Sequence, residues 1–155
     1  HTRDAMSTPF RLLDMGVPAF MVATSLQGVI AQRLVRLNCG ECHAPLQPSA
    51  QESSWLSNML ETGEGFQARR GMGCSVCNGT GYAGRQGVYE LLEMDAELTQ
   101  AASHSDPAGF MRAARERMKG HTMAYHALEL VRQGRTSLAE ALRVGFDVGD
   151  SDPED

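Results

Sequence analysis

Two stretches of sequence decide how the middle of this chain folds. The stretch GCSVCNGTGYAGRQGVYELLEM covers residues 73–94, and the stretch CGEC covers residues 39–42. Each contains one Cys-x-x-Cys pair, and 31 residues separate Cys42 from Cys74. Two intervening residues let both sulfurs of a pair turn to the same side, so two such pairs can bring four thiolates to the corners of a tetrahedron. The spacing therefore predicts a single metal site.

Zinc is the metal that this setting favours. The chain does not open with the basic start, apolar stretch and small-residue cleavage site of an export signal, so paired disulfides are not indicated. We predict a Zn²⁺ ion with four ligands, Cys39, Cys42, Cys74 and Cys77. Four sulfurs leave no open position for water, so the site is predicted to be structural and not hydrolytic. A rubredoxin-like iron site, a redox dithiol and unligated core thiols are the alternatives.

The composition is that of an ordinary globular chain. Of the 155 residues, 42% are apolar and 21% are charged, and the net charge of −5 arises mainly from residues 88–155. This charge gives no overall attraction to nucleic acid or to anionic lipid. No run of about 20 apolar residues occurs, which excludes a simple membrane-spanning helix and favours a cytoplasmic location.

Helix signals lie on both sides of the cysteines. A first helix is predicted to begin around Thr8, with Pro9 in its first position, and to end at Gly16. Apolar residues at spacings of three and four predict a long helix over residues 18–37: Val22, Leu26, Val29, Ile30, Leu34 and Leu37. Between the cysteine pairs, a short helix around Trp55 is preceded by Ser53 and Ser54.

The segment after the second cysteine pair predicts one short strand and then several helices. Residues 87–94 have the composition of a strand. Asp95, Asp106 before Pro107, Thr122 and the capping-box pattern of Ser137 and Glu140 mark four helix starts. Apolar residues at helical spacing predict a bundle over 95–146 with one common core: Phe110, Met111, Ala114, Leu128, Val131, Leu138 and Leu142.

The predicted fold class is therefore α-rich α+β. A long helix leads into a small zinc-ribbon-like module with a short strand, and a C-terminal helical bundle follows. The expected organisation is an N-terminal segment, a zinc module, a strand with a helical domain, and an acidic flexible tail, at residues 1–37, 38–87, 88–146 and 147–155.

Three blocks of the sequence resemble the secretion ATPases of bacterial type II secretion and type IV pilus assembly, including the general secretion and MSHA-pilus branches. CGECHAPL and then GCSVCNGTGYAGRQGVYELLEM are similar to the family's tetracysteine element and the strand after it. RLLDMGVPAFMVATSLQGVIAQRLVRLNC, which begins at Arg11, resembles the segment that leads from the ATPase core, and GRTSLAEALRV resembles the closing helix. The resemblance covers residues 1 to about 146.

The resemblance implies a role within a larger machine. His1 looks like the end of the family's histidine box and is the one catalytic candidate, although Arg3 replaces the usual Asn. The chain contains no Gly-x-x-x-x-Gly-Lys-Ser/Thr motif and no Walker B strand, so ATP and Mg²⁺ are expected only in the full-length parent and this chain alone should not hydrolyse ATP.

The partners implied by the resemblance are other copies of the chain in a homo-hexamer and the platform proteins of the inner membrane, with peripheral association through them. Whether the parent serves a secretion system or a pilus stays open, as does the role of the zinc module as a lever, a docking site or a purely structural element. A DnaJ-type chaperone zinc domain is one rival, although the pair at Cys39 and Cys42 lacks that motif's glycines. A zinc-ribbon module that binds nucleic acid is the other, but residues 38–87 lack the basic stripe that it needs, so no nucleic acid is expected.

Overall fold

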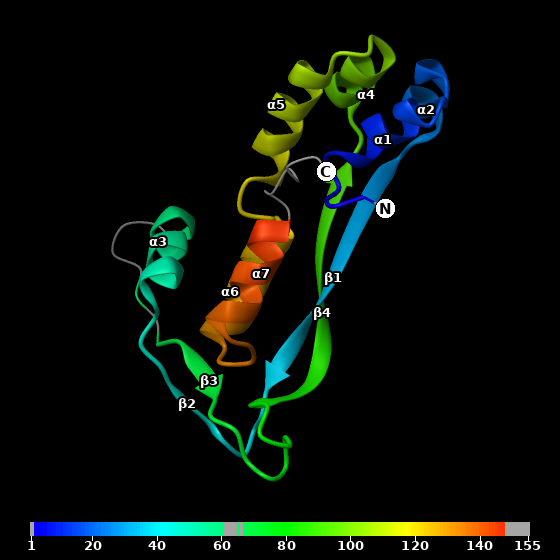
Figure 1. Ribbon diagram of the computed structural model, residues 1–155. Helices are drawn as coiled ribbons and strands as arrows, with labels where there is room; N and C mark the ends of the chain where they lie inside the picture. Colours follow the sequence, from blue (N-terminus) through cyan, green and yellow to red (C-terminus); the bar gives the residue numbers. More distant parts are fainter. Residues whose placement is uncertain (1, 61–64, 66, 148–155) are drawn as a thin grey trace, which may run out of the picture. The chain divides into compact units, whose positions relative to one another are not determined.

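The computed structural model describes residues 2–60, 65 and 67–147, and the chain divides into two compact units (Figure 1). The first unit comprises the residues up to Gln32 together with Tyr89–Thr122. The second comprises Arg33–Val88 and the residues from Met123 onward. Helices are combined with two small two-stranded sheets, so the fold is a mixed α and β fold. A helix able to cross a bilayer is not found in the part of the chain that the structure describes.

The first unit is built from four helices: α1 (Thr8–Asp14), α2 (Ala19–Ser25), α4 (Ala96–Ser103) and α5 (Pro107–Met118). The predicted start of α1 is confirmed, with Pro9 in its first turn. The Asp95 and Asp106 carboxylates accept hydrogen bonds from the backbone N–H groups of Leu98 and Gly109, which confirms both predicted caps. The core of this unit gathers around the buried Phe110 ring, which meets Phe10 edge to face at 5.1 Å between centroids.

The second unit holds the short strands β2 (His43–Pro45) and β3 (Arg69–Gly71), which pair antiparallel, and the helices α3 (Ala50–Met59), α6 (Met123–Arg132) and α7 (Leu138–Asp147). Helices α6 and α7 pack on each other through buried side chains: Met123, Ala127, Leu128, Leu130, Val131, Leu138, Ala141 and Val144. Gly134 has a φ of +72° and ends α6, as a C-terminal glycine should.

The predicted long helix over 18–37 is wrong. Helix α2 ends at Ser25, and Gly28–Asn38 form the strand β1, which pairs with β4 (Tyr82–Glu93). Exposure alternates along β1 with the period of two that a strand requires, and its β-branched residues favour extended backbone. Gly28 lies against the partner strand, since a Cβ there would be 3.2 Å from the Leu92 carbonyl oxygen. The predicted short strand over 87–94 is correct in type, but β4 begins five residues earlier.

The single helical bundle predicted for 95–146 is also wrong. Helices α4 and α5 belong to the first unit, and α6 and α7 belong to the second. Phe110 and Ala114 therefore lie in a different core from Leu128 and Val131. Helical spacing identifies the apolar face of each helix, but it does not identify the surface against which that face packs.

Two helix starts differ from the sequence prediction in an informative way. Helix α3 begins after Ser49, whose side chain forms a complete capping box with Glu52, instead of after Ser53 or Ser54. At α7 the Ser137 hydroxyl accepts from the Glu140 backbone N–H at 3.3 Å, which is only half of the predicted box. The Glu140 carboxylate instead accepts hydrogen bonds from the backbone N–H and the guanidinium group of Arg36.

Trp55 fixes the position of α3 on α7. The two helices are in contact, and a Cβ built on Gly145 would lie 2.9 Å from Trp55 Nε1. Any side chain larger than hydrogen at residue 145 would therefore push the indole away.

Candidate metal centre

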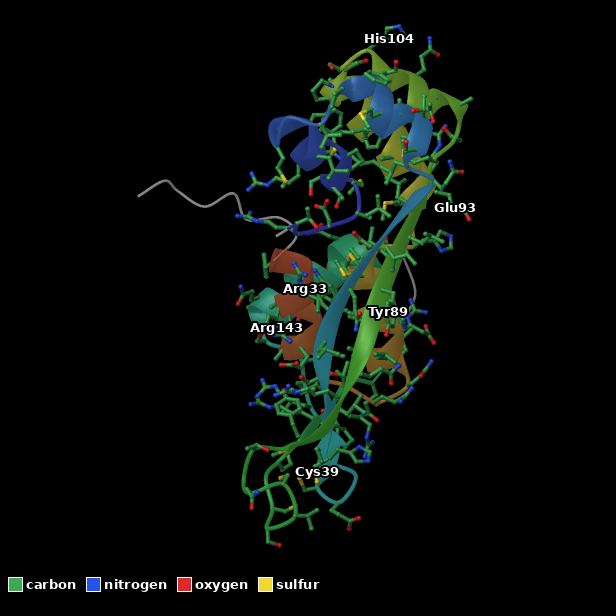
Figure 2. All side chains as sticks on the ribbon, turned by 90° about the vertical axis from the view of Figure 1, so that its right-hand side faces the viewer. Arg33, Cys39, Tyr89, Glu93, His104 and Arg143 are labelled. Atoms are coloured by element: carbon green, nitrogen blue, oxygen red, sulfur yellow. The ribbon has the colours of Figure 1, made fainter. Side chains whose placement is uncertain are left out.

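The four cysteines lie on two loops that are anchored by strands. Cys39 follows the last residue of β1 directly (Figure 2), and Cys42 immediately precedes β2. Cys74 and Cys77 lie between β3 and β4. We call residues 39–45 and 69–81 together the cysteine module. The pairing of β2 with β3 brings its two halves side by side, and the Cys39 backbone N–H donates to the Gly81 carbonyl at 2.9 Å.

The four sulfur atoms are gathered into one cluster, with every pair within 4.8 Å. The distances between Sγ atoms are 3.7 Å from Cys74 to Cys77, 3.8 Å from Cys39 to Cys74 and 3.9 Å from Cys42 to Cys77. In a tetrahedral Zn²⁺ site with Zn–S bonds of about 2.3 Å, neighbouring sulfurs lie about 3.8 Å apart. The cluster therefore fits a tetrahedral metal ion, and all four cysteines are free of disulfides.

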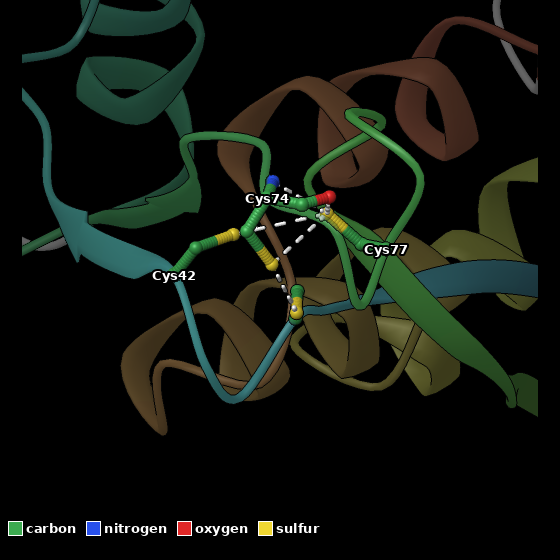
Figure 3. Close-up of side chains that lie close together, drawn as sticks. Cys42, Cys74 and Cys77 are labelled. Atoms are coloured by element: carbon green, nitrogen blue, oxygen red, sulfur yellow. Dashed lines mark hydrogen bonds between the residues drawn. The ribbon is translucent and has the colours of Figure 1, made fainter.

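Backbone N–H groups point at two of the four sulfurs. The N–H group of Cys74 donates to Cys77 Sγ at 3.2 Å (Figure 3). The N–H group of Gly81 also donates to Cys77 Sγ at 3.2 Å, and that of Gly73 donates to Cys42 Sγ at 3.3 Å. The hydrogen bond from the Cys74 backbone, together with that from Gly81, lowers the pKa of the Cys77 thiol to about 6. Burial instead raises the pKa of the Cys42 thiol to about 11. Metal binding requires thiolates, so the loop backbone favours the ligating form most strongly at Cys77.

Two contacts between glycines close the loops. A Cβ on Gly71 would overlap the carbonyl group of Gly81, and a Cβ on Gly73 would lie 2.8 Å from the Gly79 carbonyl oxygen. Gly81 and Gly73 also have φ values of +78° and +97°, which other residues rarely adopt. The pairing of Gly71 with Gly81 was not predicted from the sequence, although glycines on both sides of the second cysteine pair were a visible signal.

The histidines are not part of the cluster in the described residues. His43 lies next to Cys42, but its Nδ1 accepts a hydrogen bond from Arg69 Nε at 2.8 Å. His104, the residue after α4, has its Nδ1 2.9 Å from the Gln100 carbonyl oxygen. His1, the predicted catalytic candidate, lies outside the described residues.

Relatives of known family match this sequence over most of its length. The type II secretion system protein E of Aeromonas hydrophila is 39% identical over 146 residues, and the type II secretion system ATPase E of Vibrio cholerae is 37% identical over 144 residues. Each match covers 93% of this chain and 28% of the relative. The type IV pilus assembly ATPase PilB of Thermus thermophilus is 35% identical over 142 residues, which are 92% of this chain and 16% of that protein. The chain thus spans little more than a quarter of the length of the two type II secretion proteins and about a sixth of that of PilB.

A solved structure supports the same fold. The pilus retraction motor PilT with bound ADP matches 99% of this chain and 31% of its own chain, with a TM-score of 0.54 and 19% sequence identity. The model of the family described as "Type II/IV secretion system protein" matches residues 1–143. The family model and the relatives agree, and the chain belongs to the type II/IV secretion system protein family.

Proposed function

We propose that Cys39, Cys42, Cys74 and Cys77 hold one structural Zn²⁺ ion. The observation that carries this proposal is the separation of the sulfurs, 3.7–3.9 Å for the three closest contacts, which is the spacing of a tetrahedral thiolate site. Four sulfurs close the coordination sphere, so the ion supplies rigidity and no bound water for chemistry. The module's own residues position the sulfurs through the glycine contacts and the N–H groups described above.

Metal analysis tests the zinc proposal directly. The chain is purified without added metal and its zinc content is measured, together with that of Cys77→Ser. Ser75→Ala is the matched control, because Ser75 is exposed and lies within the same Cys-x-x-Cys turn. We expect close to one zinc per chain in the parent sequence and the control, and a large loss in Cys77→Ser. Zinc near zero in all three proteins, or iron in its place, contradicts the proposal.

For the whole protein, we propose a role in a secretion or pilus assembly ATPase. Its relatives carry such names, and the chain lacks the phosphate-binding motif that ATP hydrolysis needs. In this proposal, ATP and Mg²⁺ are bound by other residues of a longer protein, to which residues 1–37 form an edge that includes His1. The protein acts as a homo-hexamer in the cytoplasm, bound peripherally to the inner membrane through its platform proteins.

The zinc module is proposed to transmit motion. A closed four-sulfur site makes the loops between β1 and β4 stiff, and both strands connect directly to it. A stiff loop at the end of two strands can transfer a displacement to a docked platform protein, whereas an unligated loop would absorb that displacement. The alternative is a zinc site that stabilises only its own loops.

One variant distinguishes these roles. Cys39→Ser is introduced into the full-length protein, with Ser75→Ala as the control, and ATP hydrolysis, secretion or pilus assembly, and protein abundance are measured together. Transmission through the module predicts that ATP hydrolysis persists while secretion or assembly is lost at normal abundance. If secretion instead falls only in proportion to abundance, the module has a structural role alone.

A further inference from the structure

The four sulfurs of the cluster are not equivalent in their hydrogen bonds. Cys77 Sγ accepts from two backbone N–H groups and Cys42 Sγ from one. Among the described residues, no N–H group donates to Cys39 Sγ or Cys74 Sγ. A hydrogen bond to a thiolate stabilises the electron density that the sulfur must give up when it forms a new bond. Cys39 and Cys74 are therefore the two sulfurs with the least stabilised lone pairs.

Cys39 and Cys74 differ in their exposure to solvent. Cys39 is 1% exposed and Cys77 is 5% exposed, whereas Cys42 and Cys74 are half-buried. A reagent from solution must reach the sulfur before it can react, so burial protects Cys39 despite its missing donors. Cys74 alone combines access with the absence of an N–H donor.

The position of Cys74 in the cluster also supplies a second sulfur to continue the reaction. Its Sγ lies 3.7 Å from that of Cys77 (Figure 3) and 3.8 Å from that of Cys39. A shift of less than 2 Å would bring either neighbour to disulfide bonding distance, which is about 2.05 Å. Oxidation that begins at Cys74 can therefore end in a disulfide within the module.

We propose that Cys74 is the site at which hydrogen peroxide attacks the metal-binding cluster, an inference that rests on the zinc proposal. The Cys74 sulfur forms a bond to one peroxide oxygen, the O–O bond breaks, and hydroxide leaves, so sulfur is oxidised by two electrons and peroxide is reduced. The thiolate of Cys77 or Cys39 then attacks this sulfur, and a second hydroxide leaves as the disulfide forms. Two ligands are consumed in this sequence, so the oxidised cluster would release its zinc.

The test maps the first modified cysteine in the chain as purified. Zinc content is measured first, and the zinc-loaded chain is then treated with less than one equivalent of iodoacetamide, which forms an S–C bond as iodide leaves. Peptide mass spectrometry gives the share of label at each cysteine. One hydrogen bond of typical strength corresponds to about a fivefold difference in rate, so we expect about fivefold more label on Cys74 than on Cys42.

A parallel sample receives hydrogen peroxide, and its disulfides are mapped while a chromogenic chelator reports released zinc. We expect disulfides that contain Cys74 to form together with zinc release. Equal labelling of Cys42 and Cys74, or a dominant disulfide between Cys42 and Cys77, overturns the inference. A chain without zinc at the first step overturns the metal proposal instead, so the two failures are distinguishable.

Discussion

The cysteine module and the hairpin of α6 and α7 belong to the same unit, yet they are stabilised in different ways. The hairpin buries eight apolar side chains, including Leu128 and Val131. Within the module, apart from the sulfurs of Cys39 and Cys77, no large side chain is buried; the other buried residues are Gly71 and Gly81. A buried aliphatic side chain contributes about 1.5–3 kcal/mol, a source of stability that the module lacks. Its order must come from the metal, from contacts between backbones and from polar contacts such as the hydrogen bond from Arg69 to His43.

Removal of the metal should have the largest effect of all: we expect it to unfold the cysteine module and to leave the hairpin folded. Structural zinc sites contribute about 10–16 kcal/mol of apparent binding free energy. A strong chelator should therefore unfold the cysteine module while the helical signal at 222 nm stays largely unchanged. The measurements are circular dichroism and proteolysis mapped by mass spectrometry, with the zinc-saturated chelator as the control. Loss of helix in parallel with the zinc would show that the two regions are not independent.

The glycine contact provides the next test of the module. In Gly71→Ala, the new methyl group would overlap the Gly81 carbonyl, so the two halves of the module must separate and zinc content should fall well below that of the parent chain. Gly40→Ala is the matched control, because a Cβ on Gly40 meets nothing within 4 Å. Normal zinc content in Gly71→Ala would mean that the contact is not required.

A change in the hairpin should give the opposite pattern. Leu128 is 2% exposed, and Leu128→Ala should lower the free energy of unfolding by about 2–5 kcal/mol without changing zinc content at temperatures where the chain is folded. Leu128→Met keeps the volume and should cost less than about 1.5 kcal/mol. Denaturant unfolding and metal analysis on the same samples measure both quantities. If folded Leu128→Ala also lost zinc, the apolar core of the hairpin and the metal site would not be independent of each other.

The smallest change in stability is expected when the charge of Glu140 is removed. Burial by itself raises the pKa of this carboxyl, but hydrogen bonds from Arg36 and Arg143 outweigh it and hold the pKa below the ordinary value of 4.5. A lowered folded-state pKa contributes stability above 4.5, and this contribution disappears as the pH falls through the folded-state pKa. Glu140→Gln should therefore be less stable than the parent by about 2 kcal/mol at neutral pH.

The difference between the two proteins should shrink as the pH falls below 4.5, because the protonated carboxyl then resembles the amide. Thermal unfolding of both proteins across this pH range measures the gap. A gap that is constant with pH would show that the charge of Glu140 contributes nothing.

Several local signals predicted the structure correctly, whereas most long-range contacts could not be predicted from the sequence. The caps at Asp95 and Asp106 involve residues three positions apart, so a few letters contain the whole interaction. The clustering of the cysteines also follows from their spacing. In contrast, residues 28–38 have apolar positions that suit a helix as well as a strand, and only pairing with β4 decides between them.

The same limit applies within the site. Glu140 matches a capping box, but Arg36, 104 residues earlier, takes its carboxylate. The unequal hydrogen bonding of the sulfurs depends on where Gly73 and Gly81 lie after the loops close. Neither property can be predicted from residue types alone, because each depends on partners brought together by the fold.

The contact of Trp55 with Gly145 makes the junction of α3 and α7 visible by fluorescence. Trp55 is the single tryptophan of the chain, so the intrinsic indole emission comes from one contact, that of α3 with α7. A glycine inside a helix costs roughly 1 kcal/mol relative to alanine, which the indole lying close to the helix backbone can offset. Release of α3 would expose the ring to water and shift its emission to longer wavelength. The protein therefore carries a built-in fluorophore that reports on this one junction between two helices.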